Sequence, residues 1–248
     1  MTRAVILAAG QGTRLRPYTN DKPKALVELF GKALIEHQLD TLKHLNIENV
    51  AVVTGYKAEQ LVDYGYCYHN PNFASSNMVQ SLFCAERFFE RNADLLVCYG
   101  DIIYKPKVLE SLLNDKRGIC VVADLQWKEF WELRMDNPLE DAETFKVDCG
   151  RIIELGGKPK SYDEIHAQYI GLIKIPACQI HEIVDFYHSL DKKAYYDGKK
   201  FSDMYMTTFL QLLINNSFEV YPTYINRGWL EVDTVADLET YQRTQGVY

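Results

Sequence analysis

Hydrophobic and polar positions along this chain alternate between two patterns. Short runs rich in β-branched residues predict buried strands, and longer segments with apolar residues three or four positions apart predict amphipathic helices. In the first half we expect strands at residues 5–7, 50–53, 66–69, 94–99 and 119–123, and helices at residues 33–45, 57–64, 78–89 and 108–113. Strands and helices that alternate in this order favour a mostly parallel sheet that is covered on both faces.

The pattern changes near residue 127. Residues 127–135 are aromatic and charged, and residues 136–141 have the composition of a loop. Beyond them we expect short strands at residues 145–147, 152–155, 169–175 and 218–221, and helices at residues 179–188, 204–215 and 235–241. Because no linker, repeat or low-complexity tract interrupts the sequence, we expect one α/β domain over residues 1–248. It should be Rossmann-like, with a mostly parallel mixed sheet and helices on both faces.

The first predicted strand leads into a glycine-containing loop rich in cations. The sequence from Ile6 reads ILAAGQGTRL, and DKPKAL follows from Asp21. Glycine tolerates positive φ, so such a loop can turn several backbone N–H groups toward one anion. The cations that could neutralise a phosphate chain are Arg14, Arg16, Lys22 and Lys24. The loop matches neither the dinucleotide fingerprint nor the P-loop. An ordinary glycine turn with solvated basic residues is the alternative interpretation.

The order of strand, glycine loop, arginine and Lys-Pro-Lys resembles the nucleotidyltransferase family that activates sugar phosphates, phosphocholine and related phosphate esters. The residues that match its signature are Gly10, Gly12, Thr13, Arg14, Leu15, Pro23 and Lys24. The resemblance implies a fold of the nucleotide-diphospho-sugar transferase type. It also implies a nucleotide-binding half over about residues 1–124, an acceptor-binding part over about residues 125–230, and a C-terminal helix over residues 231–248.

Composition narrows the class of protein. The formal net charge of −7 argues against a nucleic-acid binder, which normally carries a basic face. No apolar run is long enough to span a bilayer, and no signal peptide precedes the first strand, so we expect a cytoplasmic protein without a membrane partner. Six cysteines without C-x-x-C spacing predict reduced thiols, and a bound metal would therefore have oxygen ligands. The oligomeric state is open, and a homodimer is one possibility.

Two aspartates follow predicted strands. Asp101 comes after residues 94–99, and Asp233 ends the segment GWLEVD. Each could simply cap a helix. However, ligands of open parallel sheets bind beyond the carboxyl ends of the strands, and the resemblance implies that these two carboxylates jointly hold Mg²⁺. We expect Glu231, two positions before Asp233, to point to the opposite face of its strand.

The resemblance implies that an acceptor phosphate oxygen attacks the α-phosphorus of a nucleoside triphosphate and releases pyrophosphate. Three cations are assigned catalytic roles. Arg14 and the main chain of residues 10–13 would hold the β- and γ-phosphates, and Lys24 would neutralise charge near the α-phosphate. Lys158 matches the family lysine that contacts the acceptor phosphate, although Gly156-Gly157 precedes it where the family often has an acidic residue or lysine.

The predicted nucleotide contacts lie at strand ends and in the loop. Besides Arg14 and Lys24 they are Leu7, Ala8, Ala9, Gly10, Gly12, Thr13, Tyr56, Asn77, Ser81 and Gly100. Asn70-Pro71, Asn77 and Ser81-Leu82 stand where many sugar-phosphate members have a Gly-Leu/Thr-Ala motif. This variant resembles the bacterial phosphocholine cytidylyltransferase branch, which implies CTP. Asn77 could also cap the helix that begins at residue 78.

The predicted acceptor-binding residues are Trp127, Trp131, Lys158, Tyr169, Gly171 and Asp203. The two tryptophans and Tyr169 could form a cage for a quaternary ammonium, with Asp203 or Asp163 as counter-charge. They could equally fill the core. Residues 136–145 resemble a subgroup that occurs with capsule and phosphonate pathways. The acceptor therefore stays open among phosphocholine, a phosphonate, phosphoglutamine and similar small esters.

Three rival functions follow from the same residues. A sugar-1-phosphate nucleotidyltransferase would use dTTP, UTP or GTP with a different pocket. A catalytically silent nucleotide-binding subunit would keep the glycine loop without chemistry, but it would have little need for the aspartate pair. A glycosyltransferase could share the sheet but is disfavoured by the N-terminal loop. We expect CTP and a small phosphorylated acceptor as partners and Mg²⁺ as cofactor.

Overall fold

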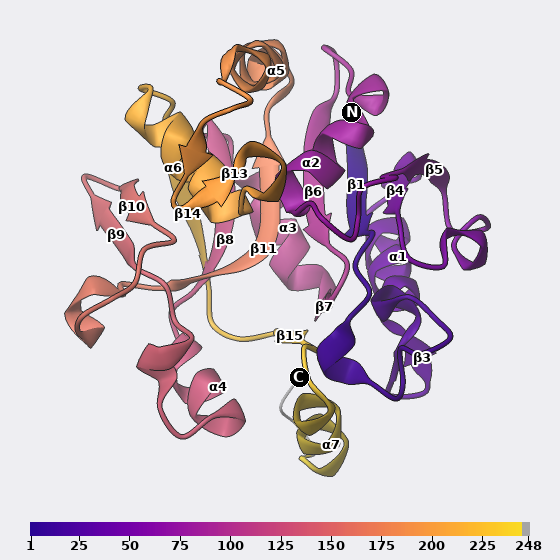
Figure 1. Cartoon of the computed structure of the whole chain (residues 1–248). Helices are drawn as coiled ribbons and strands as arrows, with labels where there is room; N and C mark the ends of the chain where they lie inside the picture. The colour runs from indigo at the N-terminus through magenta and orange to yellow at the C-terminus, as the bar shows by residue number, and fades with distance from the viewer. Residues whose placement is uncertain (245–248) are drawn as a thin grey trace.

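The computed structural model describes residues 1–244, and its centre is a seven-stranded sheet. The strand order is β14-β8-β11-β6-β1-β4-β5 (Figure 1). The bounds are β1 Thr2–Ala8, β4 Val50–Thr54, β5 Tyr66–His69, β6 Asp94–Tyr99, β8 Ile119–Asp124, β11 Gln168–Ile175 and β14 Val220–Ile225. Only β11 runs antiparallel to its neighbours in this sheet. The predicted mostly parallel mixed sheet is confirmed.

Helices cover both faces of the sheet, as predicted. They are α1 Leu34–His44, α2 Met78–Cys84, α3 Pro106–Asn114, α4 Trp127–Arg134, α5 Ile180–Ser189, α6 Met206–Asn215 and α7 Val235–Arg243. Because alternate residues of a strand point to opposite faces, β1 supplies both cores. Ile6 packs with residues of α1, α3, α4 and α7, whereas Val5 packs with residues of α2, α5 and α6.

Four pairs of strands complete the fold, and one of them matters for the site. Strand β7 (Ile102–Tyr104) pairs antiparallel with β15 (Trp229–Glu231) just beyond the carboxyl end of β6. Figure 1 shows β15 below the end of the main sheet, next to β7. The other short strands are β2 Glu28–Leu29, β3 Lys32–Ala33, β9 Phe145–Asp148, β10 Arg151–Leu155, β12 Tyr195–Tyr196 and β13 Lys199–Lys200.

The sequence predictions differ from the structure in four places. Residues 57–64 contain only a 3₁₀ turn, Ala58–Gln60, and the helix predicted at 78–89 ends at Cys84, with a second 3₁₀ turn at Glu86–Phe88. The aromatic segment from residue 127 forms helix α4, and strand β7 was not predicted. Residues 245–248 of the predicted C-terminal part lie outside the described residues. Within residues 1–244, no helix combines the length and apolarity needed to cross a bilayer.

Candidate active site

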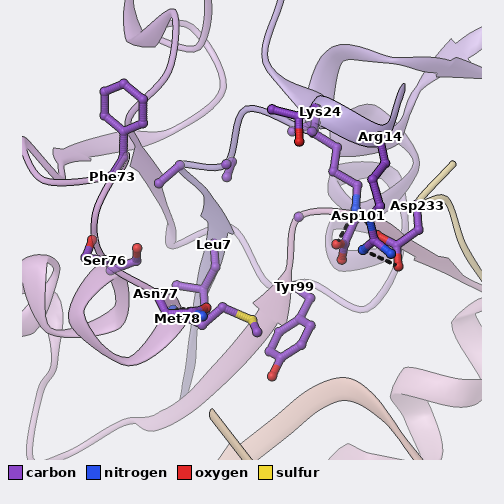
Figure 2. Close-up of a pocket in the computed structure, with 18 residues that line it drawn as sticks. Leu7, Arg14, Lys24, Phe73, Ser76, Asn77, Met78, Tyr99, Asp101 and Asp233 are labelled. Carbon is purple, nitrogen blue, oxygen red and sulfur yellow. Dashed lines mark hydrogen bonds and ion pairs between the residues drawn. The ribbon is translucent and has the colours of Figure 1, made fainter. Parts of the chain in front are cut away.

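A cavity of about 330 Å³ opens at the carboxyl ends of β1 and β6, and we call it the loop cavity. Figure 2 shows Lys24 and Arg14 beside Asp101 and Asp233 on one side, and Phe73, Ser76, Asn77 and Met78 on the other. Its lining residues are Leu7, Ala8, Ala9, Gly10, Gly12, Thr13, Arg14, Lys24, Ala25, Phe73, Ser76, Asn77, Met78, Ser81, Tyr99, Gly100, Asp101 and Asp233. All the predicted nucleotide contacts except Tyr56 are among them.

Two glycines shape this cavity for physical reasons. Gly12 has φ of 64°, and a Cβ there would lie 2.9 Å from Lys24 Cβ, so only glycine lets the lysine stem pack on the loop. At Gly100 a Cβ would lie 2.5 Å from the carbonyl oxygen of Leu7. The Gly100 N–H donates to that same oxygen at 3.0 Å, which ties the end of β6 to β1.

The opposite wall is organised by a residue that does not line the cavity. Asn70 is fully buried, and its Nδ2 donates to Ser76 Oγ at 2.9 Å and to Ser81 Oγ at 3.0 Å. Asn77 Oδ1 accepts from the Met78 N–H at 2.8 Å, so this side chain caps α2 as well as lining the cavity. The cap, which was the alternative interpretation of Asn77, is confirmed, and its contact with a nucleotide stays a prediction.

Asp101 and Asp233 are distant in sequence but adjacent in space. Pairing of β7 with β15 places Glu231 opposite Ile102, and the Val232 N–H then donates to the Asp101 carbonyl at 3.0 Å. Downstream, Asp237 fixes Asp233: its Oδ2 accepts from the Asp233 and Thr234 N–H groups at 3.0 and 2.8 Å. This cap of α7 fixes the backbone at Asp233, whose side chain lines the loop cavity.

Three cations neutralise the pair. Lys24 Nζ lies 2.7 Å from Asp101 Oδ2 and also donates to Asp233 Oδ1, and Arg14 lies 3.1 Å from Asp233 Oδ2. Arg134 lies 3.8 Å from the same oxygen. Burial alone would lower the pKa of Lys24, but Asp101 and Asp233 outweigh it and hold that pKa above its ordinary value. Burial likewise opposes ionisation of Asp233, yet Lys24 lowers its pKa.

The prediction for Glu231 was wrong. Residues two apart in a strand share a face, so Glu231 points to the same side as Asp233. A carboxylate oxygen of each of Asp101, Glu231 and Asp233 lies within 4.8 Å of the others. Glu231 pairs with Arg134 at 2.8 Å, and burial together with the Asp233 charge raises the pKa of Glu231.

These carboxylates fit a hard divalent cation. Oxygen ligands in small number, with room for phosphate oxygens, are what Mg²⁺ prefers. Asp101 Oδ1 is buried, and no described residue donates a hydrogen bond to it, so this oxygen has free ligating capacity. The three clustered acids, with Asp101 Oδ1 unsatisfied, are therefore compatible with the Mg²⁺ that the resemblance implied.

A second cavity of about 190 Å³ adjoins the first, and we call it the aromatic cavity. Both cavities are lined by Met78, Tyr99 and Asp233, so they meet beside Asp233, whereas Asp101 lines the loop cavity and not the aromatic cavity. The other residues of the aromatic cavity are Trp131, Asp141, Glu143, Gln168, Tyr169, Ile170, Gly171, Tyr205, Thr207, Trp229 and Glu231. Aromatic rings and carboxylates thus dominate its wall.

Glu143 is a second acid of this cavity whose ionisation is perturbed, besides Glu231. Its backbone is held by Gln168, which accepts from the Glu143 N–H at 3.2 Å and donates to its carbonyl at 2.6 Å. Its Oε1 lies 3.5 Å from Thr207 Oγ1. Burial, reinforced by the neighbouring Asp141 charge, raises the pKa of Glu143 to about 7. A cation in the cavity would restore the charged form.

Among the predicted acceptor residues, Trp131, Tyr169 and Gly171 line the aromatic cavity. Gly171 has φ of 86°, and a Cβ there would lie 2.6 Å from the Tyr99 ring, so glycine is required for this ring to pack.

Four other predicted residues line neither cavity. Trp127 is 5% exposed and packs edge-on against Trp131 in the core. Lys158 Nζ donates to the carbonyls of Leu139 and Glu140 at 2.7 and 2.5 Å. The Tyr56 hydroxyl donates a hydrogen bond to the Asn20 carbonyl. Asp203 ends the 3₁₀ turn Phe201–Asp203, in which the Ser202 carbonyl accepts a hydrogen bond from the Asn77 N–H. Asp163 also lines neither cavity.

Sequence reasoning missed several lining residues. Tyr99 directly precedes Gly100 at the end of a predicted strand, which is a signal that could have been used. Asp141 and Glu143 lie in the acidic segment 136–145, which also could have suggested a charged pocket. Tyr205, Thr207 and Arg134 carry no local signal, because only the fold brings them near the site.

Residues 4–145, more than half of the chain, match the sequence model of one protein family, the MobA-like NTP transferase domain. The chain belongs to this family. A CTP:phosphoglutamine cytidylyltransferase from Campylobacter jejuni is 42% identical over 246 residues, which is 95% of this chain and 97% of that protein. The solved CTP:phosphocholine cytidylyltransferase of Streptococcus pneumoniae superposes with a TM-score of 0.70 at 25% identity, covering 96% of both chains.

The chain is also similar, over a shorter stretch, to a protein named for a sugar phosphate. An N-acetylmuramate alpha-1-phosphate uridylyltransferase from Caulobacter vibrioides is 57% identical, but over only 56 residues, 23% of each chain. The full-length similarity to the Campylobacter protein is therefore the broader match. These comparisons confirm that this member of the NTP transferase family is a nucleotidyltransferase, as the glycine loop predicted.

Proposed function

We propose that the protein transfers CMP from CTP to a small phosphorylated acceptor that carries a positive charge, and releases pyrophosphate. The observation that carries this proposal is the junction of the two cavities at Asp233, Tyr99 and Met78. A triphosphate in the loop cavity and a phosphate in the aromatic cavity would meet beside Lys24 and the aspartates. The long match to a CTP:phosphoglutamine cytidylyltransferase supports the choice of CTP.

The chemistry needs no protein nucleophile or general base. An acceptor phosphate is already ionised near neutral pH, so positioning and charge neutralisation lower most of the barrier. Arg14 and the N–H groups of residues 10–13 hold the leaving pyrophosphate, and Lys24 neutralises charge at the α-phosphate. Asp101 and Asp233, with Glu231 beside them, would hold Mg²⁺. When bound, Mg²⁺ supplies charge stabilisation at the phosphate oxygens.

The lining of the aromatic cavity supports a cationic acceptor. Trp131, Tyr169 and Tyr205 offer ring faces or edges, and Asp141 and Glu143 offer negative charge. A quaternary ammonium or an amino group is stabilised by both kinds of group. Phosphocholine and phosphoglutamine each carry such a group, whereas hexose 1-phosphates do not. The role of Lys158 at the acceptor phosphate is kept as a prediction of the resemblance alone.

The test is a matrix of CTP, UTP, dTTP and GTP against phosphocholine, phosphoglutamine, aminoethylphosphonate and glucose 1-phosphate, followed by pyrophosphate release. We expect CTP with a cationic acceptor to give the highest kcat/KM, by at least about tenfold over the other nucleotides. A preference for dTTP or UTP with glucose 1-phosphate would establish the sugar-phosphate alternative. CTP binding without turnover on any acceptor would establish a silent subunit.

A further inference from the structure

The ammonium of Lys24 lies between the two carboxylates to which the metal is assigned. It is 2.7 Å from Asp101 Oδ2 and also donates to Asp233 Oδ1 (Figure 2). We propose that Lys24 is a resident cation of the metal site. It neutralises the aspartates until a triphosphate draws its ammonium into the loop cavity, so that divalent metal binds tightly only together with nucleotide. This inference rests on the proposed function for the identity of the triphosphate.

The charges explain why Lys24 and a divalent cation compete. Among the described residues, Lys24 is the only cation within ion-pair distance of Asp101. A divalent ion on the same oxygens would stand within about 4 Å of the ammonium, where like charges repel strongly in a partly buried site. Lys24 and a divalent cation would therefore compete for the same oxygens of Asp101 and Asp233.

The fold allows Lys24, but not the neighbouring Arg134, to change position. Its stem packs on Gly12 and its backbone is fixed in the 3₁₀ turn Lys24–Leu26, yet its side chain also lines the loop cavity. Rotation of the flexible four-carbon chain is enough to move the ammonium from the carboxylates to a phosphate. Arg134 is 4% exposed and tied to Glu231 and Asp237, so it stays in place.

The exchange couples two binding events. A triphosphate gains the Lys24 charge, and the aspartates lose their shared cation at the same moment. Metal affinity should therefore rise when the triphosphate binds, and triphosphate affinity should rise by the same factor when metal binds. A lysine that served only to hold the fold together would produce no such coupling.

Mn²⁺ binding to the protein without nucleotide, followed by electron paramagnetic resonance, tests this directly. We expect wild type to bind Mn²⁺ weakly, and Lys24→Met to bind it at least about tenfold more tightly because the competing charge is gone. Lys43→Met is the control, since it removes an exposed lysine of α1 that lines neither cavity, and it should leave Mn²⁺ affinity unchanged. Circular dichroism and thermal unfolding check the fold of each variant.

Weaker or equal Mn²⁺ binding in a folded Lys24→Met variant would overturn the proposal. If that variant does not fold, Lys24→Gln replaces it. The Mn²⁺ affinity of wild type without nucleotide is a second test that needs no variant. Tight Mn²⁺ binding to wild type in the absence of nucleotide would contradict a resident cation. No acceptor or turnover enters this experiment, so its failure is distinguishable from failure of the proposed transfer reaction, which the substrate matrix tests.

Discussion

The loop cavity and the aromatic cavity share three lining residues but are built from different groups. The loop cavity is lined largely by main chain and small residues at the carboxyl ends of β1 and β6. The aromatic cavity is lined by rings and carboxylates that come from α4, β11, β15 and the segments before β9 and α6. On the proposed function, the first cavity would hold the triphosphate tail, whereas the second would select the acceptor by charge and shape. General chemistry and acceptor choice would then be separated.

Removal of one of the paired aspartates, which lie beside the junction of the two cavities, should give the largest effect. We expect Asp101→Ala to lower kcat by about a hundredfold to a thousandfold, because charge at the reacting phosphates is no longer neutralised. The effect on stability should be small, since removal of the acid also relieves an unsatisfied buried oxygen. Steady-state pyrophosphate release measures the first effect and thermal unfolding the second. Near-wild-type turnover would remove Asp101 from the mechanism.

A change in the glycine loop should affect the loop cavity alone. Gly12→Ala adds a Cβ at positive φ and forces the Lys24 stem to move, at a cost of about 1–2 kcal/mol. We expect the KM for the nucleotide to rise about tenfold while the KM for the acceptor changes little. Gly31→Ala is a control, because Gly31 also has positive φ but a Cβ there meets no atom within 4 Å. Equal effects of the two variants would contradict a specific role for Gly12.

Glu143 should affect the aromatic cavity alone. Loss of its charge in Glu143→Gln should raise the KM for a cationic acceptor about tenfold, with the KM for the nucleotide unchanged. The same variant should lose less on a neutral acceptor such as glucose 1-phosphate. If the KM for nucleotide rose as much as that for acceptor, the separation of the two cavities would be wrong.

Acidity should modulate acceptor binding through the same residue. The pKa of Glu143 is raised to about 7 by burial, so a cationic acceptor binds better as pH rises through that value and the carboxyl ionises. The ligand-free fold behaves oppositely: the unfolded chain ionises near the ordinary 4.5, so the Glu143 contribution to stability is lost as pH rises from there to about 7. The ratio of the acceptor KM of wild type to that of Glu143→Gln, measured at each pH, separates the Glu143 effect from titration of the acceptor's own phosphate. The difference in unfolding free energy between the two proteins isolates the effect on the ligand-free fold. A ratio independent of pH would contradict this role.

Lys158 should give the smallest effect. Its ammonium is bound to the carbonyls of Leu139 and Glu140 and lines neither cavity, so we expect Lys158→Ala to change the acceptor KM by less than about threefold. A hundredfold increase would instead support the family role and would require the segment around Leu139 to rearrange on binding.

The difference between the cavities also explains what the sequence could predict. The loop cavity is formed by short sequence motifs at strand ends. Gly10, Gly12 and Lys24 lie close together in the sequence, so they predict a phosphate site without knowledge of the fold. The aromatic cavity depends on which residues of five separate elements turn inward, and Trp127 and Trp131 could not be distinguished without the helix that orients them. Glu231 was misplaced because the prediction put residues two apart on opposite faces, whereas such residues share a face of a strand, and β7 was too short to detect.

A crystal structure with Mn²⁺ and a non-hydrolysable CTP analogue tests the central claim most directly. The account predicts one anomalous manganese peak between Asp101 and Asp233, the triphosphate in the loop cavity, and the Lys24 ammonium on a phosphate oxygen. Manganese bound elsewhere, or a triphosphate outside the glycine loop with Lys24 still on both aspartates, would contradict it.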